Sequence, residues 1–188
     1  MSKPVICLLC GGQSTEHEVS LMSAKNVVAA IPADKYEVLI VGIAKDGSWK
    51  RYQDRQFLKN GENPEAICLA DGGTPVFPMR LDGKCVLASL GHGKEPIGFD
   101  LIFPVLHGRN GEDGSVQGLA QLLGCPCVGC PMTASAICMD KGATKQILEY
   151  EGIHTAPWMT LYSWNAIPDP DTVISRLGLP LFVKPANA

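Results

Sequence analysis

One segment of the chain gathers several side chains that could form a ligand pocket. It reads FPVLHGRNGEDGSVQG over residues 103–118 and places His107, Arg109, Glu112 and Asp113 directly after an apolar run. The apolar run predicts a buried strand, so an imidazole, a guanidinium and two carboxylates would lie at its carboxyl end, where open α/β sheets bind ligands. A solvated turn without a function has a similar composition, so this segment alone does not decide between the two interpretations.

A second segment, GGQSTEHEVS at residues 11–20, joins an apolar strand to a helical pattern. The backbone amides at a helix start attract the negative charge of a ligand, whereas the carboxylates of Glu16 and Glu18 suit an ammonium group. A pocket that offers both matches a zwitterion such as a free amino acid. It matches a dinucleotide less well, because no GxGxxG pattern is present. The alternative is that these polar side chains only cap the helix.

The elements around both segments follow an α/β pattern. Residues 5–10, 36–43 and 100–106 are compact apolar strands, and the first two are separated by a glycine turn and a helix. The apolar residues of that helix fall on related faces and are Val19, Met22, Val27, Ala30 and Ile31. A strand, helix, strand order implies a parallel sheet with a right-handed crossover. The fold class is therefore α/β with a parallel-sheet, Rossmann-like amino-terminal domain.

Two further features complete the first domain, which we place at residues 1–130. Residues 53–98 are irregular and predict an insertion at the edge, with a hairpin in which 76–81 and 84–90 flank Asp82-Gly83. A helix follows the polar loop, and a short strand is predicted at 126–128.

The pattern changes over residues 131–188. We predict a helix over 133–151, strands over 158–162 and 181–184, and a helix over 171–177 between them. This is the first part of a second, α+β domain, since it stops soon after a strand and is too short to close a core. Two lysines, Lys141 and Lys184, could converge there on one polyphosphate, although each alone is more often a solvated charge.

Composition excludes some partners. The net charge of −3 gives no basic field for nucleic acid, and no apolar run approaches the roughly 20 residues that cross a bilayer. The amino terminus lacks a signal-peptide layout, so we expect a cytoplasmic protein with free thiols. Five of the eight cysteines lie in or beside apolar segments and are expected mostly in the core: Cys7, Cys10, Cys68, Cys85 and Cys138. Cys127 and Cys130 form a CxxC without a second pair, so we predict no metal there.

Taken in order, the GGQSTEHEVS and FPVLHGRNGEDGSVQG segments, the CMDK helix and the terminal LPLFVKPANA resemble one family. They are similar to the amino-terminal half of a D-alanine:D-alanine ligase of the ATP-grasp superfamily. The resemblance spans nearly the whole chain and is weakest over residues 53–98. It implies that residues 131–188 begin an ATP-grasp domain, and that the glycine/serine-rich loop, lid and magnesium carboxylates of such ligases lie beyond this chain.

The resemblance also implies a role for each matching residue. Glu16 would bind the ammonium of the first D-alanine, Val19 would line that subsite, and His107 would orient or polarise the substrate. Glu112 would orient the site from behind His107, and Lys141 and Lys184 would hold the phosphates of ATP.

The implied activity is ATP-dependent formation of D-alanyl-D-alanine through an acyl phosphate, for peptidoglycan, with Mg²⁺ as a cofactor. The implied protein is a homodimer that associates through its amino-terminal domain. We expect the 188-residue chain alone to be inactive. Two alternatives stay open: a D-alanine:D-serine or D-alanine:D-lactate ligase, and a non-catalytic, flavodoxin-like module that binds a small ligand.

Overall fold

The computed structural model describes residues 2–53, 55–91 and 94–187 and divides the chain into two compact units. The first unit is Met1–Ala136 and the second is Ile137–Ala188. Within the described part of the chain, no helix is long and apolar enough to cross a membrane.

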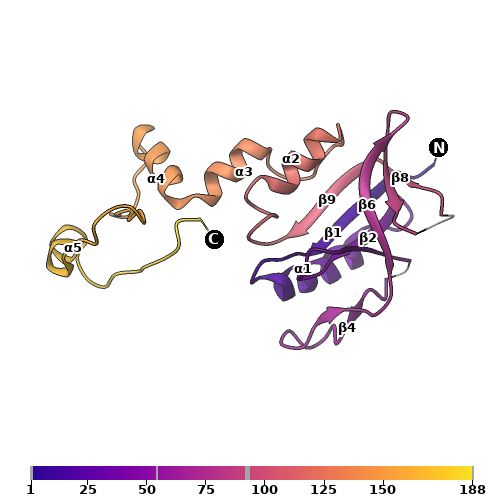
Figure 1. Cartoon of the computed structure of the whole chain (residues 1–188), viewed down its shortest axis with the longest axis horizontal. Coiled ribbons are helices and arrows are strands. Elements are labelled where there is room, and N and C mark those ends of the chain that lie inside the picture. The colour runs from indigo at the N-terminus through magenta and orange to yellow at the C-terminus, as the bar shows by residue number, and fades with distance from the viewer. Residues whose placement is uncertain (1, 54, 92–93, 188) are drawn as a thin grey trace. The chain divides into compact units, whose positions relative to one another are not determined.

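A seven-stranded sheet, counted over the described residues, forms the centre of the first unit and runs in the order β8-β7-β6-β3-β2-β1-β9 (Figure 1). Its strands are β1 (Val5–Gly11), β2 (Glu37–Ile43), β3 (Trp49–Tyr52), β6 (Thr74–Leu81), β7 (Lys84–Ser89), β8 (Ile97–Phe99) and β9 (Leu101–Leu106). β1 pairs in parallel with both β2 and β9. The predicted α/β class and its three parallel strands are therefore confirmed.

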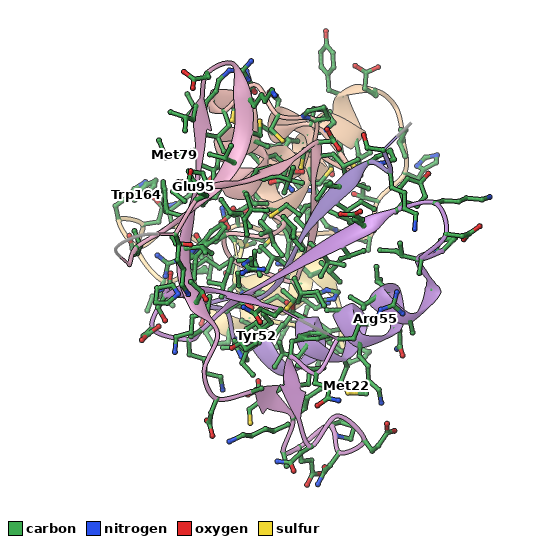
Figure 2. All side chains as sticks on the ribbon, turned by 90° about the vertical axis from the view of Figure 1, so that its right-hand side faces the viewer. Met22, Tyr52, Arg55, Met79, Glu95 and Trp164 are labelled. Atoms are coloured by element: carbon green, nitrogen blue, oxygen red, sulfur yellow. The ribbon has the colours of Figure 1, made fainter. Side chains whose placement is uncertain are left out.

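Helices cover the sheet on both faces. Side chains alternate along β1, so that Leu8 packs towards α1 (His17–Ala30) and Leu9 packs towards α2 (Ser115–Leu122). Met22 of α1 and Tyr52 at the end of β3 belong to the cluster on the α1 side (Figure 2). The two buried clusters hold the carboxyl ends of β1 and β9 in place.

The prediction of which face of α1 is buried is wrong. Val19 is 51% exposed and Ala30 is exposed, whereas Met22, Val27 and Ile31 are only partly buried. The buried residues of the helix are His17, Ser20, Leu21, Ala24 and Val28. They keep the helical spacing, but two of them are polar and one is small, so apolar periodicity does not reveal this face.

The predicted hairpin is confirmed. β6 and β7 pair antiparallel from Leu81 opposite Lys84, and the turn residues Asp82 and Gly83 both have positive φ, which is the geometry of a tight hairpin turn. The hairpin extends the main sheet at its edge, and Met79 lies on its exposed side (Figure 2).

The rest of residues 53–98 adds a small two-stranded sheet of β4 (Leu58–Lys59) and β5 (Cys68–Leu69). The strand expected at 126–128 is reduced to a single bridge between Ile102 and Cys127.

The helix predicted over 133–151 is two helices, α3 (Met132–Met139) and α4 (Lys141–Tyr150). Asp140 separates them in an extended conformation, and its carboxylate accepts a hydrogen bond from the Ala143 N–H at 2.9 Å. An aspartate at this position competes with helix continuation by capping a new helix.

The strands predicted over 158–162 and 181–184 are also wrong, since neither segment is part of a strand in the structure. An extended pattern becomes a strand only when a neighbour completes the ladder of hydrogen bonds. The predicted final helix is confirmed as α5 (Pro170–Leu177), with Asp169 as its cap.

The cysteines divide between core and surface. Cys7, Cys10, Cys85 and Cys125 are buried, and burial raises the pKa of the Cys10 thiol to about 12. The expectation of a core position is wrong for two residues, because Cys68 and Cys138 are exposed. A position beside an apolar segment does not specify which face of that segment a side chain takes.

Candidate functional site

The loop between β1 and α1 is shaped by a required glycine. Gly11 has a φ of +86°, and a Cβ there would lie 2.4 Å from the carbonyl oxygen of Ile43. The Gly12 N–H donates to that same oxygen at 2.8 Å. The buried His17 ring then donates from Nδ1 to the Gly12 carbonyl at 2.7 Å, which makes Nδ1 the protonated ring nitrogen. Gly12 is therefore fixed to β2 through its N–H and to His17 of α1 through its carbonyl, and Glu16 lies in the short loop between Gly12 and His17.

Ser20 ties α1 to both strands of the site. It is fully buried, accepts a hydrogen bond from the Gly11 N–H at 2.8 Å and donates to the Val105 carbonyl at 2.5 Å. One hydroxyl thereby satisfies backbone groups near the ends of β1 and β9, which leaves little freedom in their relative position.

The loop after β9 is closed by its own carboxylates. Glu112 Oε2 accepts from the Gly108 N–H at 2.8 Å. Asp113 accepts from the N–H groups of Asn110 and Ser115 at 2.8 and 3.0 Å. Desolvation raises the pKa of Asp113, but these hydrogen bonds outweigh it and the pKa lies below its usual value. The two acidic side chains thus stabilise the conformation of the loop by accepting hydrogen bonds from its backbone N–H groups.

His107 follows β9, and its ring is held at Nε2. Its Nε2 lies 2.9 Å from the Ser23 hydroxyl of α1, and its Nδ1 lies 3.9 Å from Glu112 Oε1. Its backbone carbonyl accepts from the Ser14 hydroxyl at 2.7 Å. A third of the side chain is exposed, so the ring is oriented and still accessible to a ligand.

Glu16 brings a carboxylate beside this histidine. Its N–H donates to Ser14 Oγ at 3.0 Å. A Cβ placed on Gly108 would lie 2.8 Å from Glu16 Oε2, so the carboxylate sits over the residue that follows His107. Within the described residues Glu16 forms no ion pair, and its side chain makes no capping hydrogen bond to α1. The charge is therefore available to a cationic ligand.

The other carboxylate that the sequence offered for an ammonium is already engaged. Glu18 pairs with Lys45 at 2.5 Å, and the hydrogen bond from Lys45 lowers the pKa of the Glu18 carboxyl. Val19 is half exposed on α1, three residues after Glu16. Glu16 and Val19 are therefore the two predicted substrate residues near the start of α1, whereas the Glu18 carboxylate is already neutralised by Lys45.

The two predicted phosphate-binding lysines lie in the second unit. Lys141 is the first residue of α4, and its N–H donates to the Ala186 carbonyl at 2.8 Å. This bond brings the start of α4 against the segment that contains Lys184, whose side chain is exposed. The bonded residue, Ala186, is two positions after Lys184, and 43 positions separate the two lysines in the chain, from 141 to 184.

Sequence reasoning missed the serines that hold the site. Ser20 and Ser23 are one turn apart on α1 and face the ends of β1 and β9. Ser20 ends the GGQSTEHEVS segment and Ser23 follows it, but the segment did not reveal their role, because their partners lie more than 80 residues away or are backbone atoms. Polar residues at the helical spacing of a buried face are the one signal that could have suggested them.

Comparisons with known proteins agree with these features. Residues 5–130 match the family model for the D-ala D-ala ligase N-terminus, which is more than half of the chain. The chain belongs to the D-alanine–D-alanine ligase family. A D-alanine–D-alanine ligase of Sodalis glossinidius is 42% identical over 98% of this chain and 51% of the relative. A ligase of Proteus mirabilis is 40% identical over the whole chain and 51% of the relative.

Solved structures of ligases share the fold. The D-alanine-D-alanine ligase of Coxiella burnetii has a TM-score of 0.75 at 35% identity, over 88% of this chain and 46% of that one. VanG D-Ala:D-Ser ligase of Enterococcus faecalis has a TM-score of 0.68 at 34% identity, over 84% and 44%. A Bacillus anthracis ligase complexed with ATP has a TM-score of 0.62 at 29% identity, over 98% and 48%. This member of the D-alanine–D-alanine ligase family spans about half the length of the curated relatives it matches.

Proposed function

We propose that this chain provides the first D-alanine site, and part of the ATP site, of a ligase that joins two D-alanines for peptidoglycan synthesis. The observation that carries the proposal is the unpaired Glu16 carboxylate over Gly108, beside a His107 ring that Ser23 holds in place. Family membership supports the identity of the substrate.

The first D-alanine binds as a zwitterion. Its ammonium pairs with Glu16, and its methyl group lies against Val19, which is exposed at the same end of α1. His107 donates from its accessible ring to the substrate and orients it. Glu112 acts as a positioning residue, since its carboxylate is close to His107 Nδ1 and is itself fixed on the Gly108 N–H.

The reaction needs activation because a carboxylate is a poor electrophile. The γ-phosphoryl group of ATP passes to a carboxylate oxygen of the first D-alanine and gives an acyl phosphate and ADP. The amine of the second D-alanine attacks the acyl carbon, phosphate leaves with the C–O bond electrons, and the amine loses a proton. Lys141 and Lys184 neutralise phosphate charge. Support comes from the Lys141 N–H at the start of α4, which donates to the carbonyl of Ala186, two residues after Lys184.

Mg²⁺ is a further part of the proposal for the complete enzyme. Within the described residues, no group of three or more carboxylate, histidine or cysteine side chains comes together as a metal site. We therefore assign no residue of this chain to Mg²⁺ and derive no step through it. We further propose a cytoplasmic homodimer that associates through the first unit.

Two related activities differ from the proposed one only in the second substrate. The VanG D-Ala:D-Ser ligase shares the fold at 34% identity, so D-serine or D-lactate is the alternative to the second D-alanine. All three reactions use the same first D-alanine, and the Glu16 site serves each of them equally. Product analysis with each acceptor separates them.

A non-catalytic binding module is the alternative of another class. It predicts that residues 1–130 bind the ligand alone, with no contribution from Lys141 or Lys184. If the chain is part of a ligase, alanine at either lysine should weaken the binding of ATP. The 188-residue chain by itself should show no D-alanine-dependent hydrolysis of ATP, and detectable turnover by it would overturn that part of the proposal.

The decisive experiment is Glu16→Gln in a fusion of this chain to the carboxy-terminal half of the S. glossinidius relative. Loss of a charge-assisted bond of about 1.5–3 kcal/mol should raise the KM for the first D-alanine about 10- to 100-fold and leave the KM for ATP unchanged. The readout is D-alanine-dependent ADP formation together with dipeptide analysis.

Glu18→Gln is the matched control. It makes the same chemical change two residues away, at a carboxylate that is paired with Lys45, and should leave both KM values within about threefold. Equal losses for D-alanine and ATP in Glu16→Gln would assign Glu16 a folding role. Binding of D-alanine to the chain alone, followed by amide NMR signals of residues 14–19 and 107–112, gives a second test.

A further inference from the structure

The first unit contains a recess on the face of the sheet opposite to the Glu16 site. It has a volume of about 200 Å³. Leu106 and Val116 line it and belong to the buried cluster under α2, whereas the next residue after Leu106, His107, turns its ring towards α1. The recess and the D-alanine site therefore share two loops and lie on opposite sides of them.

The walls of this recess suit an apolar body. They are built mainly from Ile43, Trp49, Leu106, Val116 and Leu119. The Trp49 ring is supported by Phe77, with ring centroids 6.4 Å apart. An apolar cavity of about 150 Å³ in another protein holds benzene, so the present volume accommodates one aromatic ring and a small substituent. The methyl group of an alanine is much too small to fill it.

The rim of the recess carries an unused positive charge. Arg109 lines it and makes no hydrogen bond or ion pair within the described residues. The nearest acidic side chains in the same loop are occupied, because Glu112 and Asp113 accept hydrogen bonds from backbone N–H groups. Asn110 and Gln13, also at the rim, are joined by a hydrogen bond from Asn110 Nδ2 to Gln13 Oε1 at 3.5 Å, and each amide carries a further N–H donor. The rim therefore complements an anion.

We propose that this recess binds a small aromatic monocarboxylate, with the ring between the apolar walls and the carboxylate at Arg109. Size selects the ring, and charge complementarity selects the carboxylate over a neutral or cationic group. The site is separate from the one assigned to the first D-alanine, and its test does not involve D-alanine. Failure of either proposal therefore leaves the other in place.

The test is a titration of the purified 188-residue chain with benzoate, followed by the indole N–H signals of its three tryptophans. Trp49 lines the recess and should shift with a Kd on the order of 1 mM. Trp158 and Trp164 lie in the second unit and should not move. Benzamide, which has the same shape without the charge, should bind about three- to tenfold more weakly.

Two variants link the binding to the recess. Arg109→Ala should weaken benzoate about three- to tenfold and leave benzamide unchanged, because the guanidinium is exposed and only the carboxylate uses it. Arg55→Ala removes the same charge from an exposed residue that does not line the recess, and should change neither (Figure 2). Leu119→Trp should fill the recess and abolish both.

Three results would overturn the proposal. The first is a Trp49 signal that stays fixed through the benzoate titration. The second is equal binding of benzoate and benzamide, which would mean that Arg109 selects nothing. The third is unchanged benzoate binding in a folded Leu119→Trp variant, which would place the ligand elsewhere.

Discussion

The two units of this protein differ in how their functional side chains are held. In the first unit, residues such as Leu8 and Leu9 are buried between the sheet and its helices, and a buried serine links β1 and β9. In the second unit, Phe182 and Val183 are 85% and 98% exposed, next to Lys184. The proposed amino-acid site is therefore built on its own core, whereas the start of α4 is tied to the segment after Lys184 by a backbone hydrogen bond from the Lys141 N–H to the Ala186 carbonyl.

The largest expected effect compares two glycines of positive φ, one in each unit. Gly11→Ala would put a Cβ 2.4 Å from the Ile43 carbonyl oxygen, and we expect a loss of about 3 kcal/mol in the free energy of unfolding. Gly152→Ala meets nothing within 4 Å and should cost only about 1 kcal/mol of backbone strain. Urea unfolding, followed by Trp49 for the first unit and Trp158 for the second, measures both. Equal losses would contradict the comparison.

A smaller effect is expected from hydroxyls that bond backbone groups. Ser20→Ala leaves the Gly11 N–H and the Val105 carbonyl without this partner in a buried position, and should cost about 2 kcal/mol. In the second unit, Thr144→Val removes hydrogen bonds to the carbonyls of Ile137 and Asp140, but the Asp140 carbonyl keeps the Thr144 N–H. The cost there should stay below about 1 kcal/mol.

The same pair of variants has a second readout. Ser20→Ala should also broaden the amide signals of residues 11–16 and 105–108, because it frees the two strand ends. If only Thr144→Val lowered the free energy of unfolding, the second unit, and not the first, would be the one that depends on buried hydrogen bonds.

The smallest effect is a pH dependence in the loop of the first unit. The folded pKa of Asp113 is depressed, so its stabilisation is present above the unfolded pKa of about 4 and is lost as pH falls through the lower folded pKa. Because the carboxyl is only partly buried, solvent screens its interactions and we expect well under about 1 kcal/mol. The measurement is the change in unfolding free energy between about pH 6 and pH 3 in the native chain and in Asp113→Asn. Identical changes would mean that Asp113 contributes nothing in this window.

Sequence patterns predicted the elements that depend on short stretches of the chain. Glycine turns, apolar runs and the Asp82-Gly83 pair located β1, β2, β9 and the β6–β7 hairpin. They failed where a distant partner decides the outcome. The segments 158–162 and 181–184 have strand-like composition and form no ladder, and Asp140 divides a helical pattern that looked continuous.

The sequence predicted only part of the candidate site, because some of its contacts depend on distant partners. The proximity of Glu16 to the loop of His107 follows from two adjacent parallel strands, whose carboxyl ends share one edge of the sheet. The engagement of Glu18 by Lys45 could not be predicted, since it depends on the rotation of α1 about its axis. The roles of Glu16, Val19, His107, Glu112, Lys141 and Lys184 stay predictions until the variants are measured.

By itself, the sequence determined the α/β class, the two polar loops and the family, because these depend on residue types and short spacings. Only the tertiary structure decided which face of α1 is buried, which carboxylate remains unpaired and which serines hold the histidine. It also revealed a recess behind the same loops. These properties arise from contacts between residues far apart in the chain, such as Ser14 with His107, which are 93 positions apart, and packing rather than local preference selects them.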